Sequence, residues 1–371
     1  MNRPSPLPCA SALSSLLLGV ALAAQSNTIT GLDAALTDGS GPTYQGRRGA
    51  AHPTGEIALS WALTTCNVGT ANIQWDAPMD ERHPFFAMAV VRLANGRPEQ
   101  ITRPAETYVK HGFGIGTPLD CGGTCQPTGL GLGMHCSDVY GSFSNANRFF
   151  LGPAGEIDPW LGDWVAVGSY FDRGDPDVGP PGNQDGVRSL LHGSGNFPSD
   201  PVKNRVTLPE SEVLAAGRLF YCSQLVVRGE DGDLRADDLG HRELAASYAA
   251  PDWTFADVGT WQTGSVLESW PGATVGRARN GDDDGHFVVA VVATDLGGGQ
   301  WHYEYAVHDV DNARGGAALR VPLCPTANAG NFTFRDTDDN PLNDWTAVVV
   351  GGELAFQAAA GNALEWNNIF N

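Results

Sequence analysis

The sequence has few lysines, no long apolar run and no short motif of a well-understood enzyme. Only two of its 22 basic residues are lysine, and its 42 acidic residues bring the formal charge to −20. Such acidity argues against nucleic acid as a partner, because phosphates need a basic face. No stretch of the mature chain reaches the roughly 18–20 apolar residues of a spanning helix. We therefore expect no nucleic-acid partner and no membrane span.

Residues 1–23 predict a secretory signal peptide. Arg3 precedes an apolar run from Ala12 to Ala24, and Ala21-Leu22-Ala23 has the small-x-small pattern of a cleavage site. We expect the mature chain to begin near Ala24 and to be secreted, whether extracellular, on the cell surface or in the periplasm. Cys9 would be removed with the signal.

Six cysteines remain in the mature chain. They are Cys66, Cys121, Cys125, Cys136, Cys222 and Cys324. An even number in an exported chain predicts a disulfide framework, and this outweighs zinc ligation by Cys121 and Cys125. Six thiols can pair in many ways, and their spacing does not choose among them.

Glycine and proline interrupt the chain too often for long helices, at 47 and 24 residues. The segments between them are short and β-rich. Asn95-Gly96 between residues 85–94 and 97–102 predicts a hairpin with a type I′ turn. Residues 287–294 and 301–308 predict a second hairpin. Further strands are expected at residues 317–323, 331–335, 346–350, 354–357 and 363–370.

The predicted fold is mainly β, with two β-sandwich-like domains braced by disulfides. Residues 24–285 would form a β-rich, loop-rich N-terminal domain that contains the cysteine cluster. Residues 286–371 would form an Ig-like C-terminal sandwich. We expect the last strand to pair within that sandwich, with Trp366 mostly buried.

Several motifs resemble a family of secreted bacterial proteins that has no established activity. In chain order they are Cys66-Asn67-Val68-Gly69, His83-Pro84, Lys110-His111-Gly112-Phe113, His135-Cys136-Ser137-Asp138 with Tyr140, and Trp301-His302-Tyr303-Glu304-Tyr305-Ala306-Val307-His308. Val139 departs from the family, which tends to have proline there. Members of the family continue past the last residues of this chain, so the resemblance implies a chain that ends within its closing strand.

The resemblance covers four of the six mature cysteines. Cys222 and Cys324 look like additions to that set, and we therefore expect them to bond to each other. Cys121 and Cys125 could then pair locally across their glycine-rich gap, which leaves Cys66 for Cys136.

The densest group of reactive side chains is His83, His111, His135 and Asp138. Three imidazoles and a carboxylate suit a zinc or copper site with an open position. However, no two of these histidines stand at His-x-x-x-His spacing, so the fold would have to gather distant loops. We favour the structural alternative, in which these residues support a strand start, a glycine-rich loop and a disulfide.

Two further groups leave alternatives open. Trp160 and Trp164, near Glu156, Asp158 and Asp163, could contact carbohydrate as in glycosidases, or form an ordinary acidic turn. Trp301, Tyr303 and Tyr305 alternate along one strand, which is typical of cross-strand packing and sometimes of a sugar-binding platform.

Asp-rich loops at residues 282–284, 309–311 and 336–339 could bind Ca²⁺, although solvated turns are the commoner explanation. A divalent metal or Ca²⁺ is therefore the only cofactor that the sequence suggests.

The leading functional prediction is a non-enzymatic extracytoplasmic protein: a surface, matrix or binding component with a cell-surface or polysaccharide partner. Its basis is that the chain has no Gly-x-Ser-x-Gly or other motif of known mechanism. One alternative is a zinc- or copper-dependent extracellular enzyme that uses His83, His111 and His135. A second alternative is a carbohydrate-binding or glycoside-acting protein.

Overall fold

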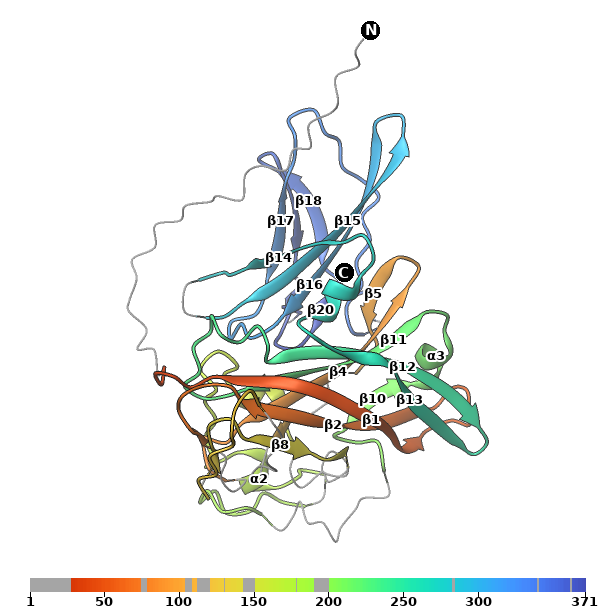
Figure 1. The fold of residues 1–371 in the computed structure, drawn as a ribbon. Coiled ribbons are helices and arrows are strands. Elements are labelled where there is room, and N and C mark those ends of the chain that lie inside the picture. Colours follow the sequence, from red (N-terminus) through yellow and green to blue (C-terminus); the bar gives the residue numbers. More distant parts are fainter. Residues whose placement is uncertain are drawn as a thin grey trace.

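The computed structural model describes residues 28–74, 79–103, 109–111, 121–129, 131–142, 151–177, 179–189, 200–281, 284–338, 340–360 and 362–371. The predicted signal peptide lies outside these ranges. Within them the fold is mainly β, as predicted, and sheets make up most of the regular structure (Figure 1). No helix in the described ranges is both long and apolar enough to cross a membrane.

Two sheets form the lower half of the molecule in Figure 1. The outer sheet consists of β1 (Ala34–Arg48), β2 (Glu56–Asn67), β8 (Ser137–Tyr140) and β10 (Val206–Pro209). The central sheet has the order β13 (Asp252–Thr263), β12 (Leu239–Ala249), β11 (Arg218–Val226), β4 (Phe85–Ala94), β6 (Val109–His111) and β9 (Leu151–Gly152), with β5 (Arg97–Gln100) paired to β4.

The Asn-Gly hairpin between β4 and β5 is confirmed. Ala94 pairs with Arg97 across the turn. Asn95 has φ 52° and Gly96 has φ 80°, the two positive values that a type I′ turn requires. The turn therefore forms where its local sequence predicts it.

Two further sheets form the upper half in Figure 1. The hairpin sheet has the order β14 (Thr274–Ala278), β15 (Phe287–Gly297), β16 (Gln300–Asp309) and β20 (Ile369–Phe370). The terminal sheet has the order β17 (Ala318–Pro322), β19 (Glu353–Gln357) and β18 (Thr346–Val350). Because β14 pairs with β15, the expected boundary at residue 285 falls between two strands of one sheet. The division into two sandwich domains stays a prediction.

The remaining regular elements are short. They are β3 (Ile73–Gln74), which pairs with β7 (Gly131–Leu132), the helices α2 (Tyr170–Arg173) and α3 (Glu210–Leu214), and the 3₁₀ turns η3 (Ala154–Glu156) and η5 (Val266–Ser269).

The central sheet is covered on both faces. Leu219 and Tyr221 of β11 pack with Trp61 against the outer sheet. The alternate residues Phe220 and Cys222 belong to a second core with residues of the hairpin sheet, among them Val288 and Ala306. Side chains alternate between faces along a strand, so a strand buried on both faces needs apolar residues at consecutive positions. This explains the continuous apolar texture of β11.

The end of the chain is only partly the strand expected at residues 363–370. Ile369 and Phe370 pair with β16, whereas Leu364 makes a single bridge to Gly316. Trp366 is buried, as expected, at 8 % exposure. It packs in a core with central-sheet residues, and its Nε1 donates to Gln224 of β11 at 3.0 Å. The end of the chain thus joins the two halves of the molecule.

Candidate functional site

The cysteine cluster forms two disulfides, Cys66–Cys121 and Cys125–Cys136. The expected pairings of Cys66 with Cys136 and of Cys121 with Cys125 were wrong. The register of β2 and β8 gives the reason, because it sets Cys66 opposite Ser137 and leaves Cys136 one residue away. Neighbouring residues point in different directions, and Cys136 bonds to Cys125 instead.

The expected bond between Cys222 and Cys324 was also wrong, since neither residue takes part in a disulfide. Cys222 is buried in the central sheet, and Cys324 follows β17 of the terminal sheet. The two cysteines belong to different layers of the fold. Both disulfides therefore lie in the N-terminal half.

The histidines of the predicted metal site are not gathered by the described part of the chain. His83 is fully buried, and burial lowers its pKa to about 3, so it is neutral. His135, at φ 57°, packs against the backbone of Gly123. Burial raises the pKa of Asp138 to about 6.

Within the described ranges, no three His, Cys, Asp or Glu side chains are arranged to hold a metal ion. This applies to His83, His135 and Asp138, and to the described parts of the Asp-rich loops. The side chain of His111 and residues 282–283 lie outside those ranges.

The loop with two tryptophans is held by its own acidic residues. Trp164 is 3 % exposed, and its Nε1 donates to Glu156 at 3.4 Å. Asp158 accepts from the backbone N–H of Trp160 and Leu161, both at 2.9 Å. Burial of Trp164 in the core corrects the suggestion that its ring contacts carbohydrate.

Trp160 is half-buried. The Arg235 guanidinium lies over its ring, 5.1 Å from the centroid, so one face is already covered. Its position does not favour the suggested carbohydrate contact either.

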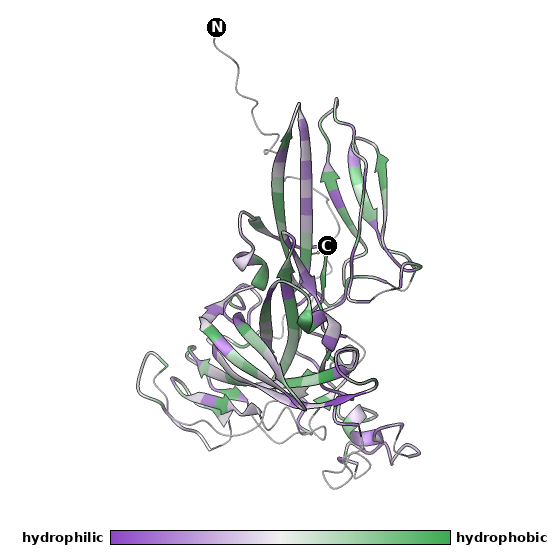
Figure 2. Ribbon diagram, turned by 90° about the vertical axis from the view of Figure 1, so that its right-hand side faces the viewer, coloured by the Kyte–Doolittle hydropathy of each residue, from purple (hydrophilic) through white to green (hydrophobic). Residues whose placement is uncertain are grey.

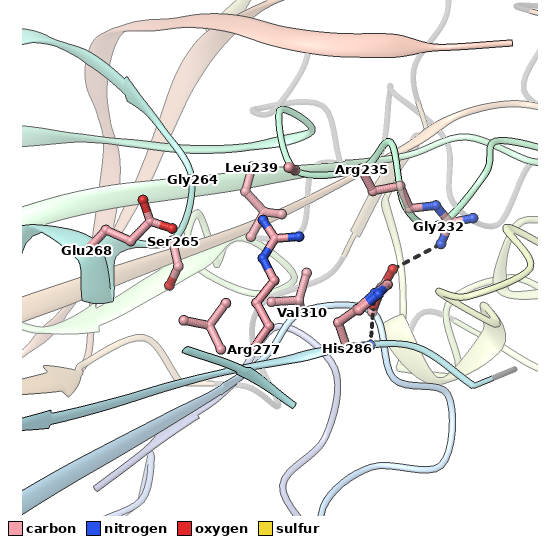
Figure 3. Close-up of a pocket in the computed structure, with 12 residues that line it drawn as sticks. Gly232, Arg235, Leu239, Gly264, Ser265, Glu268, Arg277, His286 and Val310 are labelled. Atoms are coloured by element: carbon pink, nitrogen blue, oxygen red, sulfur yellow. Dashed lines mark hydrogen bonds and ion pairs between the residues drawn. The ribbon is translucent and has the colours of Figure 1, made fainter. Parts of the chain in front are cut away.

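A small pocket lies between the central and hairpin sheets (Figure 3). Asp311 accepts from the backbone N–H of His286 at 2.6 Å and from Arg235 at 3.2 Å. The side chain of Arg277 extends across the space. About 10 Å³ is left for the centre of a water molecule, which is room for roughly one ordered water. We interpret the pocket as a polar junction between sheets.

Two serine–histidine pairs hold η5, the turn between the central sheet and the hairpin sheet. His241 of β12 contacts Ser269 at 2.6 Å through Nε2 and the carbonyl oxygen of Gly264 at 3.1 Å through Nδ1. His308 of β16 contacts Ser265 at 2.9 Å, and burial lowers its pKa to about 4. Both serines belong to η5 or its N-cap, so neutral histidines hold this turn between the sheets.

Trp301, Tyr303 and Tyr305 form an aromatic ladder along β16. The ring centroids of Trp301 and Tyr303 are 6.5 Å apart with 30° between planes. Those of Tyr303 and Tyr305 are 6.3 Å apart with 19° between planes. Trp301 is 50 % exposed and Tyr303 is 53 % exposed, whereas Tyr305 is half-buried. The three rings therefore present an apolar surface to solvent.

The ladder lies on the face of the hairpin sheet that packs against the terminal sheet nearer the base. On the same face and nearer the base, Phe287 and Val307 share a core with Leu319 and Phe356 of the terminal sheet. Figure 2 shows the two sheets as separate layers in the upper part of the molecule. Strand periodicity sets which residues share this face, but contact with the second layer decides which of them are buried.

An ion pair holds the β15–β16 hairpin on the face opposite the aromatic ladder. Arg97 of β5 donates to Glu304 through Nε at 2.8 Å. Glu304 also contacts Nε2 of His302 at 3.1 Å. These contacts hold the hairpin at the central sheet and leave the aromatic ladder clear.

No protein-family model, curated protein or solved structure matches this chain. The function must therefore be inferred from the geometry of the chain itself, in which the aromatic ladder is the best candidate site.

Proposed function

We propose that the protein is an exported, non-enzymatic binding protein and that its aromatic ladder contacts a polysaccharide of a cell surface or matrix. The observation that carries this proposal is the half-exposed pair of Trp301 and Tyr303, whose ring planes are tilted by 30° to each other. A pyranose ring has a face of C–H groups, which packs on an aromatic face while the hydroxyl groups stay in water.

A structural role alone explains the ladder poorly. Large aromatic side chains stabilise a fold mainly through the area that they bury. Trp301 and Tyr303 each leave half of that area in solvent. Contiguous exposed apolar surface on a protein often marks a contact site. Exposed aromatic rings with a polar edge are also frequent in binding surfaces.

The candidate catalytic groups support binding over catalysis. Glu156 and Asp158, which lie near Trp160 and Trp164, accept hydrogen bonds from Trp164 and from backbone N–H groups. The two disulfides fit the proposed export, because such bonds persist in oxidising compartments.

Sedimentation with insoluble polysaccharides tests the proposal. Wild-type protein should be depleted from solution by at least one of cellulose, chitin, chitosan and xylan. Trp301→Ala should weaken binding about 30-fold, since an anchoring aromatic contributes roughly 2 kcal/mol. Tyr303→Ala should have a similar effect.

Leu342→Ala is the matched control, because Leu342 is an apolar side chain that is 90 % exposed and belongs to a turn before β18, not to the ladder. It should bind like the wild type. Circular dichroism would confirm that each variant is folded. Equal binding by Trp301→Ala and the wild type, or no binding to any of the four materials, would contradict the proposal.

A further inference from the structure

We infer that the polysaccharide bound by the ladder carries protonated amino groups, as in a deacetylated amino-sugar polymer. This inference rests on the proposed function and adds the charge of the ligand to it. It comes from a carboxylate that accompanies the ladder and from the lack of basic side chains among the described residues of the same hairpin face.

Asp295 is the carboxylate beside the ladder. It pairs directly with Trp301 across the β15–β16 hairpin. Directly paired residues lie on the same face, with Cβ atoms about 4.5–5.5 Å apart. Asp295 is exposed, and its Oδ1 accepts from the N–H of Gly297 at 2.8 Å. The strand pairing therefore places Asp295 on the face of Trp301, and the turn fixes its carboxylate near the tip of the hairpin.

An indole face beside a carboxylate suits an ammonium group. Cations are attracted to the face of tryptophan more strongly than to other aromatic rings. The carboxylate adds a direct charge interaction and accepts a hydrogen bond from the ammonium. The polymer could thus stack a pyranose ring on the ladder and place its amino group near Asp295.

Among the described residues, this face of the hairpin carries no basic side chain and two acidic ones, the buried Asp309 at its base and the exposed Asp295 near its tip. The β15 neighbours of Asp295 on this face are Val291 and Ala293, and the nearest β16 positions are the three aromatic rings. The nearby guanidinium of Arg97 approaches the opposite face, where Glu304 neutralises it. The chain as a whole has a formal charge of −20. A uronate, sulfate or phosphate polymer would therefore be repelled.

The direction of the ladder sets the shape of the ligand. Each ring lies two residues along β16 from the next, with centroids 6.5 Å and 6.3 Å apart. Only an extended chain with repeated flat faces can contact all three rings. A single small cation would use the Trp301–Asp295 end alone.

Chitosan and chitin test the inference as a pair, because they share one backbone and differ in whether the amine is free or acetylated. Alginate serves as an acidic polymer. With the polymers immobilised on beads at pH 5, where the chitosan amines are charged, the wild type should bind chitosan at least twofold more tightly than chitin and should not bind alginate. Trp301→Ala should lose chitosan binding.

Asp295→Asn should weaken chitosan binding roughly two- to fivefold, as expected for an exposed charge pair. It should leave any chitin binding unchanged. Asp231→Asn is the matched control, because Asp231 also accepts a backbone N–H two residues ahead, from Asp233 at 3.1 Å, and its replacement changes the net charge equally.

The outcomes separate the two proposals. Ladder-dependent binding that is equally strong for chitin, or is unaffected by Asp295→Asn, would overturn the inference and leave the proposed function intact. Chitosan binding that Asp231→Asn weakens as much as Asp295→Asn would show a diffuse attraction to the acidic surface, and would overturn the inference. No ladder-dependent binding to any polysaccharide would overturn both.

Discussion

Strands β11 and β16 carry similar alternating bulky residues but lie in opposite surroundings. In β11 every residue from Leu219 to Val226 is buried, because one sheet covers each face. In β16 the residues from Gln300 to Tyr303 are exposed, although the same strand is buried from Ala306 onward except for Val307. The number of covering layers, and not the strand pattern itself, decides which aromatic residues become core.

Two tyrosines make the same point. The hydroxyl of Tyr221 in β11 donates within a fully buried site, where the carbonyl oxygen of Gly39 lies at 2.6 Å and Asp257 at 2.7 Å. Tyr303 in β16 is 53 % exposed. A buried tyrosine needs a partner for its hydroxyl, whereas an exposed one can use water and keep its ring for a ligand.

The largest expected effect is the difference between a core tryptophan and a ladder tryptophan. Trp61 is fully buried and donates to Ser223 at 2.8 Å. Trp61→Ala should lower the free energy of unfolding by about 3–5 kcal/mol through the cavity that it leaves. Trp301→Ala should change it by about 0.5 kcal/mol or less. Urea unfolding measures both, and equal losses would show that the ladder is packed like the core.

The disulfides provide a second contrast, because both lie in the N-terminal half. Removal of Cys66–Cys121, which spans 55 residues, should cost about 4 kcal/mol on the chain-entropy model. Removal of Cys125–Cys136, which spans 11 residues, should cost about 3 kcal/mol. Paired cysteine-to-alanine variants in urea would measure these losses. A disulfide-linked peptide containing Cys222 and Cys324 would contradict the assignment.

The third prediction concerns pH and a buried acidic pair where β1 begins. Glu230 accepts from the N–H of Ala34 at 2.6 Å. Burial raises the pKa of Glu230 from 4.5 to about 7, and the pKa of Asp238 well above its ordinary value. Repulsion between the two acids adds to the rise for Asp238, while Arg235 opposes it in both.

The folded protein therefore holds these protons more tightly than the unfolded chain does. For Glu230 the stabilisation is complete below about pH 4.5 and is lost as the pH rises through about 7, which amounts to about 3 kcal/mol. Glu230→Gln should flatten the loss of stability between pH 5 and pH 8. Parallel curves for the variant and the wild type would reject this assignment.

The sequence predicts those structural features that depend on residues close together in the chain. The type I′ turn at Asn95-Gly96, the hairpin of β15 and β16, and the mainly β fold all follow from local preference. The segment at residues 331–335 did not become a strand, although Arg335 exchanges backbone hydrogen bonds with Asn371. The disulfide pairing was missed because it depends on the register of β2 and β8, which lie far apart in the chain.

The sequence predicts that the ladder residues share one face of a strand, but not that this face is exposed. Alternation indicated that Trp301, Tyr303 and Tyr305 share a face. Whether that face is core or contact surface depends on where the terminal sheet packs against it, and no residue within β16 encodes this. The buried serine–histidine pairs were not predicted at all, since their members lie on separate elements.

The smallest expected effect on stability concerns β18, an edge strand of the terminal sheet. Val348, Val349 and Val350 are 39 %, 53 % and 56 % exposed, and residues 346–350 carry no charge or proline. Uncharged apolar edge strands tend to pair with other chains. Val349→Lys should therefore slow aggregation on warming, while changing the free energy of unfolding by about 0.5 kcal/mol or less.

Light scattering at matched concentrations would measure this difference. Ala318→Lys is the control, because it adds the same charge to β17, the opposite edge, which already has Arg320 and Pro322. Its effect on aggregation should be smaller than that of Val349→Lys. If both variants aggregate at the same rate, net charge alone governs association, and the uncharged β18 edge has no special part in it.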